Sequence, residues 1–339
     1  MFVADESIAY IEYSTDREGS VRGVQISRQS MLAHARSLCL ALNYKEGQTL
    51  ICVLDFKREA GLWHSCIAAI YAGMRVIFVP YSLLKINPTC WLLQATQQSA
   101  QFALVKSRDL HWSLLAVRDH SQLQLGSLER ILVSDSANPW ALSSCDQFCA
   151  VFSKRGLSPT AICPCAGSSE AGTVALRQPF RQQENEQQNN ENVNNNEQQP
   201  KWGSGRGTLS MLALSHCVVR LEPENSINSL AIQDTGQVIP GGMAVVVKLN
   251  GPPSLCRSDE IGEICLHSTS TSNGFYGLKG LSSKIFDVLP LGIDDKPIGP
   301  LRYVRSGLIG FLGPNGMIFA VGAKQSLLYV SGRIHNSDD

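Results

Sequence analysis

Near its start the chain reads Tyr13-Ser14-Thr15-Asp16-Arg17-Glu18-Gly19-Ser20-Val21-Arg22-Gly23-Val24. An apolar run, residues 8–11, precedes this stretch, and a helical pattern follows it after Ser27. A strand, a small polar loop with glycines, a second strand and a helix form a phosphate-loop layout, because backbone N–H groups in such a loop can converge on anionic oxygens. However, Asp16 and Glu18 stand where a phosphate grip needs small neutral residues.

The composition sets limits on the class of protein. The chain has 339 residues, 44% of them hydrophobic and 17% charged, which is enough for a large core or two domains. Its net charge of zero gives no broad basic field for nucleic acid or an anionic membrane. No apolar run is long enough to span a bilayer, and the first six residues lack the basic start of a signal peptide.

The 11 cysteines do not form a recognisable metal motif. Cys163 and Cys165 would point to the same face of a strand, but no second pair completes a zinc site. We therefore expect buried, reduced thiols in a cytoplasmic protein. Three histidines on helical patterns, His34, His64 and His111, have no triad or metal spacing, and we expect them to be satisfied, partly buried side chains.

The first half of the chain alternates strand-like and helix-like segments. Buried strands are predicted at residues 49–54, 75–79, 102–105 and 130–133, with helical stripes at 31–42 and 63–71. A third helix is predicted to open with Asn87 as its N-cap and Pro88 in its first position. Strands and helices in alternation predict a mainly parallel sheet covered on both faces.

The second half predicts antiparallel strands. They include residues 243–249, 263–266 and a hairpin at 311–319 with Asn315-Gly316 in its turn. Residues 181–201 are almost all Gln, Asn and Glu and cannot bury enough surface to offset chain entropy, which predicts a disordered insertion. We expect an α/β part at 1–180, the insertion at 181–206, the rest of the domain with a β-rich subdomain at 207–325, and a further subdomain that begins at 326–339.

The opening loop resembles the phosphate loop of the adenylate-forming (AMP-binding) superfamily, of the fatty-acyl-AMP ligase type. The resemblance makes five residues phosphate-loop candidates, with Arg22 in place of the family's lysine: Ser14, Thr15, Gly19, Arg22 and Gly23. Arginine is always charged and grips phosphate in a bidentate way. Two interpretations remain open: the loop binds phosphate, or Arg–carboxylate pairs within the loop hold it closed without a nucleotide.

Two further stretches resemble family motifs. Gly61 and Leu62 match a motif that opens a helix bordering the acyl pocket, and Trp63, which follows it, is a candidate to line that pocket; a core role for Trp63 is the alternative. Residues 166–170 match the motif that supports adenine, with Ala166 in place of its aromatic residue, and this match makes Gly167, Ser168, Ser169 and Glu170 nucleotide-binding candidates. Glu170 would hold Mg²⁺ near the phosphates; alternatively, it is a favourable charge at a helix N-terminus.

A third match is altered at its functional positions. Arg305 is retained as a nucleotide-binding candidate, but Leu308 stands where the family has the aspartate that holds both ribose hydroxyls. Ala323 replaces an arginine that contacts ribose. The resemblance therefore implies two lost ribose contacts, and no catalytic residue is assigned.

The resemblance implies a fold and a function. The fold is α/β, a large-subdomain fragment of an adenylate-forming, acyl-CoA synthetase-like domain. The implied activity is that of an ATP- and Mg²⁺-dependent acyl-AMP or acyl-CoA ligase in fatty-acid metabolism, with a fatty acyl group or acyl-adenylate and the rest of the parent chain as partners. We expect this fragment to be inactive, because the resemblance places the family's catalytic lysine in the C-terminal subdomain, of which 326–339 would be only the start.

The alternative is a non-catalytic acyl-binding, lipid-binding or scaffold domain, a pseudo-enzyme in a protein of neuronal development. A closer match, to the first such domain of one member of the family, is carried by four phrases at residues 53–57, 106–109, 137–140 and 162–165.

Overall fold

The computed structural model describes residues 6–15, 19–116, 121–138, 141–177, 205–223, 226, 228–330 and 333–336. The predicted insertion at 181–206 lies outside these residues except for its last two, and Arg206 already belongs to a strand, β9 (Arg206–Ser210). The proposed domain boundaries remain predictions.

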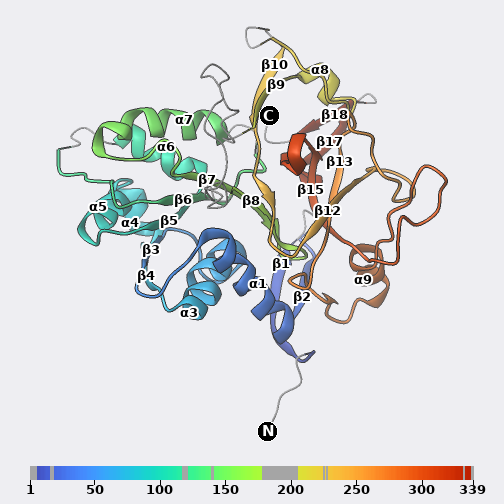
Figure 1. Cartoon of the computed structure of the whole chain (residues 1–339), viewed down its shortest axis with the longest axis horizontal. Coiled ribbons are helices and arrows are strands. Elements are labelled where there is room, and N and C mark those ends of the chain that lie inside the picture. The colour runs from blue at the N-terminus through green and yellow to red at the C-terminus, as the bar shows by residue number, and fades with distance from the viewer. Residues whose placement is uncertain are drawn as a thin grey trace, which may run out of the picture.

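A seven-stranded sheet organises the first half of the described chain (Figure 1). Its order is β11-β8-β7-β6-β5-β3-β4, and the five strands from β7 to β4 run parallel, as predicted. The parallel strands are β3 (Thr49–Cys52), β4 (Arg75–Phe78), β5 (Phe102–Val105), β6 (Arg130–Val133) and β7 (Ile162–Ser168). The antiparallel strands β8 (Gly172–Leu176) and β11 (Gln237–Val238) extend the sheet at one edge.

Helices cover both faces of this sheet, because successive strand residues enter two different cores. One core joins Leu50 of β3 to α1 (Arg28–Leu42) and to a continuous helix of three parts: α2 (Glu59–Leu62), η1 (Trp63–Ala68) and α3 (Ala69–Ala72). The other core joins Ile51 to α4 (Tyr81–Ile86), α5 (Cys90–Gln97), α6 (Ser107–Ala116) and α7 (Ala141–Phe152). None of the described helices combines the length and apolar character that a membrane crossing requires.

The helix start predicted at Asn87 and Pro88 is wrong. Asn87 is the C-cap of α4, and α5 begins only at Cys90. The Asn87 carboxamide oxygen accepts hydrogen bonds from the backbone N–H (3.1 Å) and the hydroxyl (2.7 Å) of Thr89. These bonds form a turn that joins two short helices, a use of Asn that competes with N-capping.

The second half contains the predicted antiparallel strands. A four-stranded sheet has the order β12-β13-β15-β16, formed by β12 (Met243–Val247), β13 (Gly262–His267), β15 (Val304–Leu312) and β16 (Ile318–Ala323). The β15–β16 hairpin turns at Pro314–Gly316, where Asn315 and Gly316 have φ of 57° and 71°. The remaining elements are α8 (Met211–Leu214), β10 (Ser229–Gln233), α9 (Lys279–Phe286), β17 (Leu327–Val330), β18 (Arg333–Asn336) and the short helices η2 (Ser153–Arg155), η3 (Pro314–Gly316) and η4 (Lys324–Ser326).

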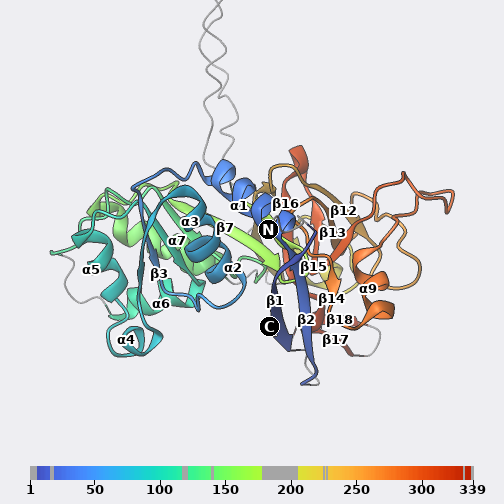
Figure 2. The ribbon, with the colours of Figure 1, turned by 90° about the horizontal axis from the view of Figure 1, so that it is seen from below.

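A hairpin connects the two halves. β1 (Ile8–Thr15) pairs antiparallel with β2 (Val21–Ser27), and β14 (Gly274–Phe275) adds to β2 from the second half of the chain. Figure 2 shows β1 and β2 between the α/β part and the β-rich part. Residues of this hairpin therefore lie at the junction of the α/β part and the β-rich part.

Candidate functional site

The phosphate-loop candidates lie at one end of the β1–β2 hairpin. Ser14 pairs with Arg22, and Tyr13 with Gly23, in the antiparallel register. Gly19 has a φ of 82°, in the left-handed region that favours glycine. Asp16, Arg17 and Glu18 lie outside the described residues, so both interpretations of the loop remain open.

Glu170 faces this end of the hairpin. It lies in the turn between β7 and β8, so its interpretation as a helix N-terminal charge is wrong. Burial raises the pKa of the Glu170 carboxyl; Glu59 raises it further, and Arg22 lowers it. Glu170 is therefore within electrostatic range of one carboxylate and one guanidinium. The Arg22 guanidinium also lies 5.9 Å from the centre of the Phe275 ring.

Gly167, Ser168 and Ser169 shape the turn between β7 and β8. A Cβ on Gly167 would lie 2.4 Å from the Gly172 carbonyl oxygen, so the close approach of β7 and β8 requires glycine there. The Ser168 hydroxyl accepts a hydrogen bond from the Ala171 N–H at 3.3 Å. The Ser169 hydroxyl donates to the carboxylate of Glu12 on β1 at 3.2 Å.

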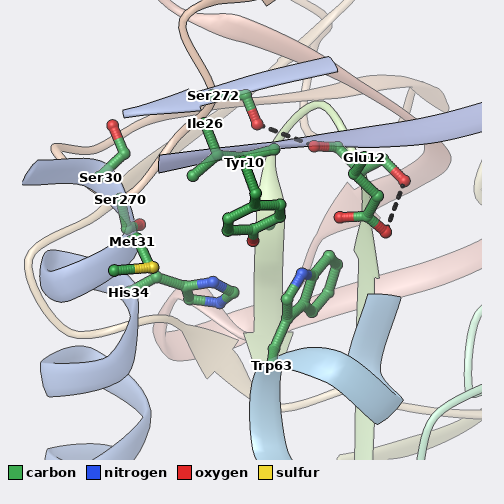
Figure 3. A pocket seen from close by; sticks show the side chains of 11 residues that line it. Tyr10, Glu12, Ile26, Ser30, Met31, His34, Trp63, Ser270 and Ser272 are labelled. Carbon is green, nitrogen blue, oxygen red and sulfur yellow. Dashed lines mark hydrogen bonds between the residues drawn. The ribbon is translucent and has the colours of Figure 1, made fainter. Parts of the chain in front are cut away.

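Glu12 is a buried carboxylate in a small enclosed pocket (Figure 3). Its side chain is only 4% exposed, and its Oε1 accepts hydrogen bonds from the Glu59 N–H (2.6 Å) and Ser169. Its Oε2 makes no hydrogen bond of good geometry among the described residues and lies on the side of Tyr10 and Trp63 in Figure 3, where Trp63 lowers the pKa of the carboxyl slightly. Burial raises the pKa values of both Glu12 and Tyr10.

The acyl-pocket candidates leave little room beside Glu12. Trp63 is 4% exposed and packs edge-on against His34, with ring centres 5.1 Å apart. The cavity that these side chains line has a volume of about 10 Å³, which corresponds to one water molecule. Gly61 contacts the backbone of Asp55, where a Cβ would meet a carbonyl oxygen at 2.0 Å, and half-buried Leu62 packs against the core. Only Trp63 of the three lines the cavity.

Leu308 and Ala323 are direct cross-strand partners in β15 and β16. Leu308 is 5% exposed and belongs to the same core as Ile264 and Ile318. The structure thus brings together the two positions at which the family resemblance places the ribose contacts, and both carry apolar side chains.

Arg305 forms an ion pair within the β-rich sheet. Its guanidinium donates to Oε2 of Glu263 at 2.5 Å, and the same oxygen accepts from the Lys324 ammonium at 3.0 Å. Glu263 is 1% exposed. Arg305 thus belongs to an ion cluster around the buried Glu263 in the β-rich sheet, and its role in nucleotide binding stays a prediction.

The residues present fit only part of a nucleotide site. Mg²⁺ takes one or two protein carboxylates together with phosphate oxygens, and Glu170 is one such carboxylate, with Glu59 within electrostatic range of it. No group of three or more metal-ligating side chains occurs among the described residues. A ribose does not fit the Leu308–Ala323 pair, because neither side chain can accept or donate a hydrogen bond.

The sequence interpretation missed the importance of Glu12 and understated the burial of two histidines. Strand alternation places Glu12 on the same face as Tyr10 and Ser14, a signal that was available from the sequence. His34 and His64 are buried, and burial lowers their pKa values to about 4 and about 3. The His34 Nε2 accepts a hydrogen bond from the Thr173 N–H (3.2 Å), whereas the His64 Nε2 has no partner among the described residues.

All 11 cysteines are free thiols; six of them are buried, as expected, and five are only partly buried. Cys163 and Cys165 donate to the backbone carbonyls of Arg177 and Val133, and burial raises the pKa values of both thiols.

No family model matches the sequence. Among curated proteins, the chain is 50% identical to Disco-interacting protein 2 of Drosophila melanogaster, over 99% of this chain and 19% of that protein. It is 46% identical to human Disco-interacting protein 2 homolog B, over 98% of this chain and 20% of that protein. The chain thus spans about a fifth of these relatives. This is the resemblance that the four phrases predicted.

Among solved structures, the chain is similar to a fatty acyl-adenylate ligase from L. pneumophila in complex with acyl adenylate and pyrophosphate. The TM-score is 0.78 at 19% identity, over 96% of this chain and 52% of that chain. This likeness shows the fold, which is the one the sequence predicted. The chain is therefore a homologue of a segment of Disco-interacting protein 2, and it has the fold of an adenylate-forming ligase domain.

Proposed function

We propose that this segment is an adenylate-forming ligase-like domain that is degenerate in nucleotide binding and serves fatty-acyl activation or lipid homeostasis within a longer parent protein. The observation that carries the proposal is the pairing of Leu308 with Ala323 in the β15–β16 hairpin. The family resemblance places an aspartate and an arginine there, which would clamp the ribose.

The loss of the two ribose contacts should weaken nucleotide binding by a measurable amount. A hydrogen bond to a charged group contributes about 1.5–3 kcal/mol, so two lost contacts weaken nucleotide binding by about 10²–10⁴-fold. Leu308 also leaves the ribose hydroxyls desolvated and without partners, which adds a penalty.

The end of the site that would hold the phosphates supports residual binding of a nucleotide. Arg22 stands at the end of the hairpin within electrostatic range of Glu170, and Ser14 is its cross-strand partner. These residues suit phosphate and Mg²⁺, so we expect weak binding of acyl-adenylate.

A second candidate function is that of a non-catalytic scaffold or acyl-binding domain in a protein of neuronal development. The observation that favours a scaffold is the cavity of about 10 Å³ beside Trp63, which has no room for an acyl chain. Acyl binding at this place would require Trp63 or Tyr10 to move.

The proposal predicts that the chain does not catalyse ATP–pyrophosphate exchange with medium- or long-chain fatty acids, because the ribose is not held for attack on the α-phosphate. The measurement compares the chain with a Glu170→Ala variant, which removes the Mg²⁺ candidate. Exchange at the same background level in both is expected; turnover that Glu170→Ala abolishes would show that the domain is an active ligase.

A further inference from the structure

A groove of about 610 Å³ lies beside α9; its lining shares no residue with the cavity beside Glu12, and Arg305 is the one site candidate among its lining residues. Its walls are α9, the segment 287–291 that follows, Arg305 at the start of β15 and Lys324 just after β16. Its volume is in the range of small-molecule sites. Apolar side chains form much of its lining, among them Leu281, Ile285, Leu289 and Leu291.

The groove has an excess of positive charge. Arg305 and Lys324 share a single carboxylate oxygen of Glu263, so two cations face one buried anion. Lys324 is 45% exposed and reaches solvent. Lys284 adds a third cation to the lining, while the carboxylate of Asp287 lies 3.6 Å from Arg302. Four cations in and around the groove therefore face two carboxylates.

These cations retain hydrogen-bonding capacity. A guanidinium has five N–H donors and an ammonium three, and the bonds to Glu263 use one of each.

We propose that this groove binds an amphiphilic anion: a carboxylate or phosphate headgroup that contacts Lys284, Arg305 and Lys324, attached to an aliphatic chain that covers Leu281, Ile285 and Leu291. The headgroup neutralises the excess positive charge through charge-assisted hydrogen bonds. The aliphatic chain removes half-buried apolar side chains from water. This binding does not depend on nucleotide binding or on the proposed function.

The test is calorimetric titration of the chain with decanoate, decyl phosphate and decyltrimethylammonium, each below its micelle concentration. Both anions are expected to bind, and the cation at least about tenfold more weakly. The stronger of the two anions identifies the headgroup. Dodecyl homologues should bind more tightly, by up to about fourfold for each CH₂ that enters the groove.

Two lysines of α9 give a matched pair of variants. Lys284→Glu reverses a charge that lines the groove and should weaken anion binding about tenfold. Lys279→Glu makes the same change at the start of α9, outside the lining, and should leave the affinity unchanged. Lys324→Gln is a further variant that leaves Arg305 on Glu263, and it too should weaken binding.

Thermal unfolding checks that each variant is folded, and methyl NMR shifts of Ile285 report binding at the groove itself. Equal weakening by Lys284→Glu and Lys279→Glu, equal affinity for the cationic amphiphile, or binding that leaves the Ile285 methyl unshifted would each overturn the proposal.

Discussion

Acidification from about pH 7 to pH 5 should destabilise the fold through His34 and His64, each by about 2 kcal/mol, rising to about 3 kcal/mol near pH 4. Burial lowers their pKa values from 6.5 to about 4 and about 3. Below pH 6.5 the unfolded chain takes up two protons that the folded chain does not accept. The stability is therefore complete above the unfolded pKa and is lost as the pH falls.

Other groups oppose this trend, so variants must be compared. The raised pKa values of Glu12 and Glu170 mean that the folded chain binds their protons first, which favours folding as the pH falls. Urea unfolding of the wild type and of His64→Gln at both pH values isolates one histidine. The wild type should lose about 2 kcal/mol more than His64→Gln.

His111→Gln on α6 is the matched control, because His111 is exposed. The free energy of unfolding of the His111→Gln variant should fall between pH 7 and pH 5 by as much as that of the wild type. Equal losses in His64→Gln and the wild type would mean that His64 is not buried in its neutral form.

Arg305→Ala should destabilise the chain by about 3 kcal/mol. Glu263 is 1% exposed, and the change would remove its contact at 2.5 Å and leave only the half-exposed Lys324. The cost arises chiefly from a buried carboxylate that loses a partner, rather than from the strength of the pair itself. The measurement is the free energy of unfolding in urea.

Arg302→Ala provides the control on a neighbouring arginine. Arg302 is 58% exposed and lies 3.6 Å from Asp287, so its loss should cost at most about 1 kcal/mol. Similar costs for both variants would show that Glu263 is accessible to water and that the ion cluster does not stabilise the sheet.

The sequence predicts the repetitive parts of this fold well. The strands β3 to β6 are apolar runs of β-branched and aromatic residues, and Asn315-Gly316 identifies the β15–β16 turn by its backbone preference. Asn87 misled the helix prediction, because a local hydrogen bond to Thr89 uses the same oxygen that an N-cap would use.

The sequence predicts the candidate site less completely, because its contacts join distant segments. Glu12 is buried by Glu59 and Ser169, 47 and 157 residues away, and no local pattern carries that information. The alignment of Leu308 with Ala323 depends on a register shift between Ile309 and Gly310. The family resemblance identified both residues, but their pairing emerged only in the structure.

We propose that the Leu308–Ala323 pair weakens nucleotide binding, so restoring the polar residues should strengthen it. A carboxylate at position 308 would accept two charge-assisted hydrogen bonds from the ribose hydroxyls. Leu308→Asp alone buries an unpaired carboxylate, whereas Ala323→Arg supplies a cross-strand partner, so the double variant is the appropriate protein.

The most direct measurement is calorimetric titration of a non-hydrolysable acyl-adenosine sulfamate into the wild type and into the folded Leu308→Asp/Ala323→Arg variant. We expect weak binding to the wild type and binding at least about tenfold tighter in the double variant. Equal affinity in the two proteins would contradict it, because the nucleotide would then not lie against β15 and β16.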